Sequence, residues 1–147
     1  MDHLKGQDRF LAFRVFGYRE KIMKIILVLL GGAIGTGCRF GLTNLVAMMW
    51  REPPKYPYST FIANITGCFL IGLLAELFEA RMPVSAEIRA AILVGILGGY
   101  TTFSSFSFET LSFIRDDQYG IAMFYSLGSV AVGLMATWLG VQLARLG

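Results

Sequence analysis

The sequence predicts an all-α membrane protein that crosses a bilayer with four helices, the third of which is broken near the midplane. Three observations predict this class. The 147 residues are 55% hydrophobic and have a mean hydropathy of +0.60, which is too apolar for a water-soluble domain of this size. The apolar residues come in long blocks separated by short polar segments. The third block contains a run of glycine, threonine and serine that is unfavourable for a continuous helix.

Residues 1–23 are polar and basic, and they precede the first apolar block. This block is too long for the apolar part of a signal peptide, and no small-residue cleavage site follows it. The segment either forms a weakly amphipathic helix on the membrane surface or lies before the natural start, since Met23 stands directly before the block. We expect residues 24–147 to form the membrane domain.

The first span is expected over about residues 25–50, long enough to cross a hydrocarbon core of about 30 Å. Its glycines have the small-xxx-small spacing that lets helices approach closely. They are Gly31, Gly35, Gly37 and Gly41. Arg39 stands out, because a charge at this depth needs a partner. We expect it to tie this helix to the broken helix in preference to contacting an ion directly.

The second span is expected over about residues 58–80, directly after a proline-rich loop that cannot be helical. Asn64 is the one amide well inside a span. Its two N–H groups are donors without a formal charge. They can serve a hydrogen bond between helices or bind a ligand, and the sequence alone leaves both alternatives open.

The third span, about residues 88–114, contains the predicted break around Gly98, Thr101 and Thr102. Unpaired backbone groups are costly in hydrocarbon, so a break survives only where protein surrounds it or where it lines a cavity. Phe103 and Phe106 are three residues apart and share one face of a helical turn. The edge of each ring is positive and could contact a small anion. The alternative is that both rings serve packing alone.

The fourth span is expected over about residues 119–143, which places both termini on one side of the membrane. Lysine and arginine decide the orientation of such a chain. Counted from Met23, the basic residues are nearly balanced between the two sides, and the chain could insert either way. With the whole tail included, one orientation is strongly favoured. The start of translation therefore decides between these two expectations.

Several function classes are excluded by composition. The two cysteines, Cys38 and Cys68, lie in separate predicted spans and form no CxxC motif, and His3 is the only histidine. These residues cannot form a zinc site or a Ser-His or Cys-His catalytic pair. The net charge of +3 is typical of basic residues that flank membrane spans. We therefore expect neither enzymatic activity nor a nucleic-acid partner.

The chain resembles the bacterial fluoride channels (Fluc, also called CrcB) from about Lys24 to the C-terminus. Three motifs carry the resemblance, and the last of them is specific. They are Gly31-Gly32-x-x-Gly35-x-x-x-Arg39-Phe40, Ser59-Thr60-x-x-x-Asn64-x-x-Gly67 and Gly98-Gly99-Tyr100-Thr101-Thr102-Phe103-Ser104-Ser105-Phe106-Ser107.

The resemblance implies an antiparallel, dual-topology homodimer in the bacterial inner membrane, with two pores through which fluoride leaves the cell passively. It also implies a structural Na⁺ at the dimer centre, held by backbone carbonyls of Gly98 and Thr101. The residues that it assigns to the fluoride path are Asn64, Phe103, Phe106, Ser104, Ser105, Ser129, Tyr125 and Glu109. Glu109 is implied to lie at one mouth of the pore. Gly133 departs from the family, since many members carry a second serine there.

We expect selectivity for fluoride by size, because two bulky rings would narrow the path. Two other functions agree less well with the sequence. A small multidrug exporter also has four spans, but it needs a carboxylate in the first, where this chain has Arg39 and no acidic residue over 25–50. A scaffold subunit would explain the glycines and aromatics as packing. It would not explain an amide and several hydroxyls gathered at a helix break.

Overall fold

The computed structural model describes the backbone of residues 2–49 and 55–146, and the side chains from Tyr18 onwards within these ranges. Every secondary-structure element in them is helical. The elements are α1 (Asp2–Met48), α2 (Tyr58–Ala80), α3 (Ala86–Ala90), a π-helical turn (Ala91–Ile96), α4 (Leu97–Tyr100), α5 (Phe103–Arg115) and α6 (Tyr119–Leu146).

Four helical stretches are long and apolar enough to cross a membrane, as predicted. They are Tyr18–Met48, Tyr58–Ala80, Ala86–Arg115 and Tyr119–Leu146. The third stretch is built from α3, the π-helical turn, α4 and α5. The division of the chain into a tail (1–23) and a membrane domain (24–147) stays a prediction.

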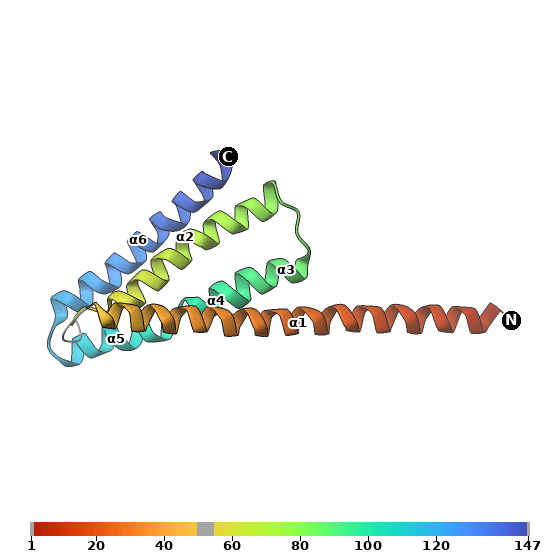
Figure 1. Cartoon of the computed structure of the whole chain (residues 1–147), viewed down its shortest axis with the longest axis horizontal. Coiled ribbons are helices and arrows are strands. Elements are labelled where there is room, and N and C mark those ends of the chain that lie inside the picture. The colour runs from red at the N-terminus through yellow and green to blue at the C-terminus, as the bar shows by residue number, and fades with distance from the viewer. Residues whose placement is uncertain (1, 50–54, 147) are drawn as a thin grey trace.

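Helices α2 and α6 lie side by side and make the most extensive contact between elements (Figure 1). Glycines allow this close approach. A Cβ atom at Gly72 would collide with the backbone oxygen of Thr137, and one at Gly140 would collide with the backbone oxygen of Phe69. The pair therefore packs backbone against backbone, as small residues permit in membrane helices.

Helix α1 packs in the same way against the first half of the third span (Figure 1). A Cβ atom at Gly31 would lie 2.5 Å from the carbonyl oxygen of Ala91, and one at Gly95 would lie 2.7 Å from that of Val28. Gly37 and Gly41 behave differently, because a Cβ atom there would meet nothing within 4 Å among the residues described. Within the described residues, the glycines at 31 and 35 therefore make close helix contacts, and those at 37 and 41 do not.

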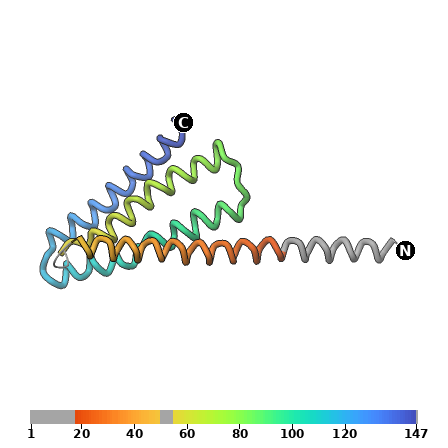
Figure 2. The backbone as a smooth tube through the Cα atoms, in the orientation of Figure 1, coloured from red at the N-terminus to blue at the C-terminus, as the bar shows by residue number. Residues whose placement is uncertain are grey.

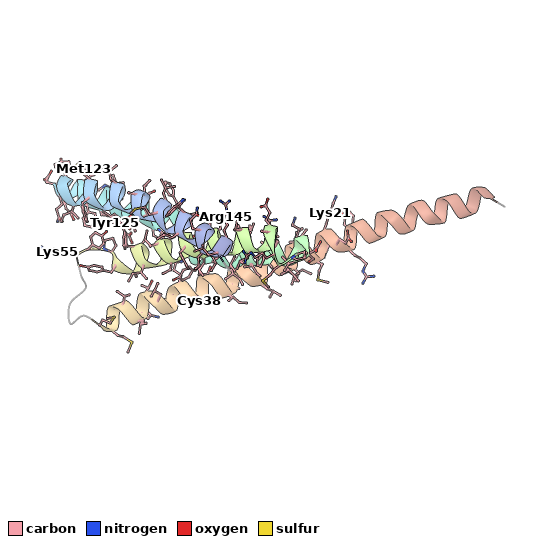
Figure 3. The ribbon with its side chains drawn as sticks, turned by 90° about the horizontal axis from the view of Figure 1, so that it is seen from above. Lys21, Cys38, Lys55, Met123, Tyr125 and Arg145 are labelled. Atoms are coloured by element: carbon pink, nitrogen blue, oxygen red, sulfur yellow. The ribbon has the colours of Figure 1, made fainter. Side chains whose placement is uncertain are left out.

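The C-terminal end of α6 is held to the end of α2 by a few polar contacts. Arg145 near the end of α6 donates to Glu76 of α2 through Nε at 2.8 Å, and Arg81 donates to the Arg145 carbonyl at 2.8 Å. Figure 3 shows Lys55 and Met123 at one end of the bundle and Arg145 at the other. The ion pair between Arg145 and Glu76 therefore lies at the end of the α2–α6 pair that is opposite to Lys55 and Met123.

Candidate functional site

The third span is interrupted at Thr101 and Thr102, about half-way along its length. Both residues have extended backbone angles, with ψ at 162° for Thr101 and φ at −152° for Thr102. Figure 2 shows that α4 and α5 follow one another in the same general direction, so they still form one span. The predicted interruption is present, but it lies just after the glycine pair, and Gly98 itself is helical.

Threonine side chains satisfy the helix ends at the interruption. The backbone N–H and the hydroxyl of Thr101 both donate to the Leu97 carbonyl, at 3.0 and 2.9 Å. The hydroxyl oxygen of Thr102 accepts from the backbone N–H of Ser105 at 3.2 Å and so caps α5. Ser or Thr at the N-cap position is the usual way to satisfy the first free N–H groups of a helix.

Asn64 of α2 bridges the interruption with its amide group. Its Nδ2 donates to the Thr102 carbonyl at 3.0 Å, and the Thr102 N–H donates to Asn64 Oδ1 at 2.8 Å. One side chain thus satisfies both backbone groups of a residue that has left the helix, which removes the main cost of a break in hydrocarbon. One of the two amide hydrogens of Asn64 is left for another acceptor.

The same contacts leave backbone oxygens available at Gly98 and Thr101. In an uninterrupted helix the Thr102 N–H would bond the Gly98 carbonyl and the Ser105 N–H would bond that of Thr101. Here the first donates to Asn64 and the second to the Thr102 hydroxyl. Carbonyl oxygens are suitable ligands for a hard cation. Of the two positions that the resemblance assigns to Na⁺, the Gly98 carbonyl therefore fits a cation, whereas the Thr101 carbonyl already accepts a hydrogen bond from Arg39. Within the described ranges no cluster of three His, Cys, Asp or Glu side chains competes for a metal.

Arg39 of α1 contacts the interruption directly. Its Nη1 donates to the Thr101 carbonyl at 3.4 Å, which is the one hydrogen bond of this guanidinium within the described structure. The contact links α1 to the broken helix. It also places a positive charge beside one of the two carbonyls, which opposes a cation at that oxygen.

A first cavity, here called the aromatic cavity, lies on one side of the interruption and has a volume of about 340 Å³. The rings of Phe103 and Phe106 line it with centroids 5.7 Å apart and planes at 43°. Ser129 of α6 also lines it, and its Oγ is buried without a hydrogen-bond partner in the described structure. The complete lining is Asn64, Gly67, Cys68, Ile71, Leu93, Leu97, Gly98, Thr101, Thr102, Phe103, Phe106, Ser129 and Val130.

A second cavity, here called the arginine cavity, has a volume of about 200 Å³ and is lined mainly by hydroxyl groups around one charge. Its lining is Thr36, Arg39, Phe40, Thr43, Ser59, Thr60, Thr102 and Ser105. Thr102 is the one residue that lines both cavities. The interruption is therefore the partition between an apolar cavity with neutral donors and a polar cavity with a cation.

Glu109 of α5 lines neither cavity. Its two carboxylate oxygens accept hydrogen bonds from the Thr60 hydroxyl at 2.6 Å and from the Tyr125 hydroxyl at 2.7 Å. Tyr125 is fully buried. The centroid of its ring lies 5.2 Å from that of the Phe106 ring and 5.3 Å from that of the Tyr56 ring. Glu109 thus joins α2, α5 and α6 through two short hydrogen bonds, one of them to the hydroxyl of the packed Tyr125 ring.

The residues assigned to the fluoride path therefore do not all meet in one place. Asn64, Phe103, Phe106 and Ser129 line the aromatic cavity, and Ser105 lines the arginine cavity. Ser104 is exposed and lies 3.2 Å from the Thr102 hydroxyl. Tyr125 and Glu109 line neither cavity and are joined by a partly buried hydrogen bond, beside the Phe106 ring.

Several residues of the site were not assigned to it from the sequence. They are Thr36, Thr43, Ser59 and Thr60. A signal for part of this set was present. Thr36 and Thr43 are spaced three and four residues from Arg39 and therefore share its face of α1. Thr60 is four residues before Asn64 on α2, but nothing in the sequence pairs it with Glu109.

Comparison with known proteins places the chain in a family. The family model described as "CrcB-like protein, Camphor Resistance (CrcB)" matches residues 26–141. The chain belongs to the CrcB family. The resemblance inferred from the motifs is thereby confirmed, and the chain is a multi-pass membrane protein.

Relatives of this CrcB-family chain carry an informative name. A protein of Methylobacillus flagellatus named "Fluoride-specific ion channel FluC" is 42% identical over 126 residues, which are 84% of this chain and 95% of the relative. A protein of Acidobacterium capsulatum with the same name is 44% identical over 119 residues, 81% and 94% of the two chains. A protein of Pseudomonas putida with the same name is 45% identical over 125 residues, which are 84% of this chain and 98% of the relative.

Proposed function

We propose that this CrcB-family protein is a fluoride-selective channel that lets cytoplasmic fluoride leave the cell passively. The observation that carries the proposal is the aromatic cavity beside the interruption. Its lining contains an amide, hydroxyls and two phenyl rings, and no charged side chain. The relatives are named fluoride-specific ion channels, which supports fluoride as the transported ion.

The chemistry of the cavity suits a small and strongly hydrated anion. A pore for such an ion must replace its water with other donors. The second N–H of Asn64 and the unpartnered hydroxyl of Ser129 are neutral donors within this lining. The positive edges of Phe103 and Phe106 add a weak attraction. Neutral groups hold the ion less tightly than a full charge would, so it can leave quickly.

The arginine cavity supports a role in collecting anions from water. A guanidinium has five N–H donors, and Arg39 uses one of them in a long bond to Thr101. Helix α5 begins beside this cavity, and the positive end of a helix dipole favours an anion there. We propose that fluoride enters here and passes Thr102 and Ser105 into the aromatic cavity.

The proposal includes an antiparallel homodimer with a structural Na⁺ and two pores. Two carbonyl oxygens per chain, from Gly98 and Thr101, are too few to enclose a cation, but two chains would supply four. Gly98 is exposed in the single chain, which leaves room for a second copy at this position. When bound, the ion would neutralise these backbone dipoles at the centre of the assembly. If so, replacing Na⁺ by N-methylglucamine should lower the dimer fraction of the purified protein, measured by cross-linking.

The deciding experiment is anion efflux from proteoliposomes, followed with a fluoride electrode and, separately, a chloride electrode. We expect fast fluoride efflux when valinomycin balances charge with K⁺, little chloride efflux, and no requirement for a proton gradient. A proton-coupled exporter would need the gradient, and a scaffold subunit would give no efflux above protein-free liposomes. Either result would refute the channel.

A further inference from the structure

Cys68 of α2 points across the groove between α2 and α6. A Cβ atom built at Gly133 would lie 3.4 Å from Cys68 Sγ, so the thiol already fills the space over this glycine. Cys68 also lines the aromatic cavity. The thiol is therefore part of the cavity wall and is held there by contact with the facing helix.

The thiol continues a row of neutral polar groups along the groove. Asn64 and Cys68 are four residues apart on α2, and Ser129 and Gly133 are four residues apart on α6, so each pair shares one helix face. Three side chains on these two faces thus line the same cavity: Asn64, Ser129 and Cys68. Within the described residues, neither the Ser129 hydroxyl nor the Cys68 thiol is given a hydrogen-bond partner.

We infer that Cys68 lines the anion path and supplies a weak S–H donor at the level where α6 has only Gly133. The inference rests on the proposed function and adds a residue to its path. A thiol is a weaker donor than a hydroxyl, yet it occupies the position that a side chain at 133 would otherwise reach.

The first test uses the small neutral reagent methyl methanethiosulfonate. The Cys68 thiolate attacks the sulfenyl sulfur, the S–SO₂ bond breaks, methanesulfinate leaves, and the thiol proton passes to water. The product is a mixed disulfide that carries a methyl group into the cavity. In Cys38→Ser, whose only thiol is Cys68, we expect labelling to reduce fluoride efflux at least ~5-fold, with recovery after dithiothreitol.

Cys38 provides the matched control. It is exposed on α1 and lies on the opposite side of the bundle from Met123 and Tyr125 of α6 (Figure 3). In Cys68→Ser, whose only thiol is Cys38, the reagent should leave efflux at that variant's own starting value. Mass spectrometry of each labelled sample establishes which thiol has reacted.

A second test moves the hydrogen-bond donor from position 68 of α2 to position 133 of α6. Cys68→Ala removes the donor, which should lower efflux about threefold to tenfold. Adding Gly133→Ser to this variant places a hydroxyl in the vacated space and should recover at least half of the lost efflux. Gly133→Ser alone crowds the thiol and should not increase efflux.

The outcomes separate this inference from the proposed function. Absence of fluoride efflux before any reagent is added would refute the channel itself, and the inference with it. Normal efflux that is unchanged when Cys68 is fully labelled would refute only the place of Cys68 in the path. Failure of the folded protein to label at Cys68 would refute it as well. The labelling rate gives a readout independent of flux, since fluoride should slow it more than gluconate does.

Discussion

The two cavities beside the interruption share Thr102 but would treat an anion differently. The arginine cavity holds a fixed positive charge and several hydroxyls, so it attracts anions of many kinds. The aromatic cavity has no charged lining residue and can distinguish anions only by size and by the placement of its donors. In the proposed channel, anions would therefore be attracted on one side of Thr102 and discriminated on the other, and substitutions should separate these two effects.

The largest effect is expected at the partition itself. Asn64→Leu removes both hydrogen bonds to the Thr102 backbone, and each buried group left unpaired costs about 1–3 kcal/mol. We expect a lower free energy of unfolding and at least ~100-fold slower fluoride efflux. Asn44→Leu is the control, because Asn44 is exposed on α1. Wild-type efflux in Asn64→Leu would show that transport does not depend on the hydrogen bonds between Asn64 and Thr102.

The second effect concerns discrimination. Phe106→Ile removes the ring that contacts both Phe103 and Tyr125. We expect efflux of fluoride to fall roughly 10-fold and its preference over chloride to decrease, since one of the two ring edges that line the aromatic cavity is lost. Phe108→Ile, on the exposed face of the same helix, should leave both quantities unchanged. An unchanged preference in Phe106→Ile would exclude the ring edges as the basis of selectivity.

The third effect concerns attraction. Arg39→Gln keeps a donor beside Thr101 but removes the charge. We expect about 3- to 10-fold slower efflux at low salt and a smaller difference at high salt, because screening already weakens the charge there. The fluoride-to-chloride preference should not change. Arg115→Gln at the exposed end of α5 is the control. A changed preference in Arg39→Gln would mean that the arginine cavity also discriminates.

The smallest effect is expected at Ser105, which lies on the arginine side of the partition. Its hydroxyl accepts from Thr102 at 3.1 Å, while the capping bond uses its backbone N–H. Ser105→Ala should therefore leave α5 intact and slow efflux only about 2-fold. Ser107→Ala is the control, because Ser107 is exposed on the same helix. A loss tenfold or greater would place Ser105 in direct contact with the ion.

The four helices and the interruption could be predicted because both depend on local composition. Long apolar blocks give spans, and a Gly-Gly-Tyr-Thr-Thr run weakens a helix. The exact position of the break could not be predicted. It depends on Asn64, 38 residues away in sequence, which draws the backbone of Thr102 out of the helix while Gly98 stays helical.

The division of the site into two cavities was also beyond the sequence. The motif around residues 98–107 reads as one continuous string, but Ser105 and Phe106 are neighbours within α5 that point in different directions, because successive helical residues are about 100° apart. Which cavity each of them lines depends on how α5 is placed among the other helices. Glu109 shows the same limit. The resemblance implies that it lies at a pore mouth, which stays a prediction, while the contacts of its carboxylate depend on Thr60 and Tyr125 on two other helices. The transport role of each residue stays a prediction.

The joint between Asn64 and Thr102 bears on how transport can work at all. Sliding α2 past the broken helix would sever two hydrogen bonds at once, at about 1–3 kcal/mol for each group left bare. A carrier that alternates between inward and outward forms by such a movement would have to meet this cost in every cycle. A channel that keeps one conformation does not break these hydrogen bonds. Its transport rate can then be limited by the movement of the ion between neighbouring sites.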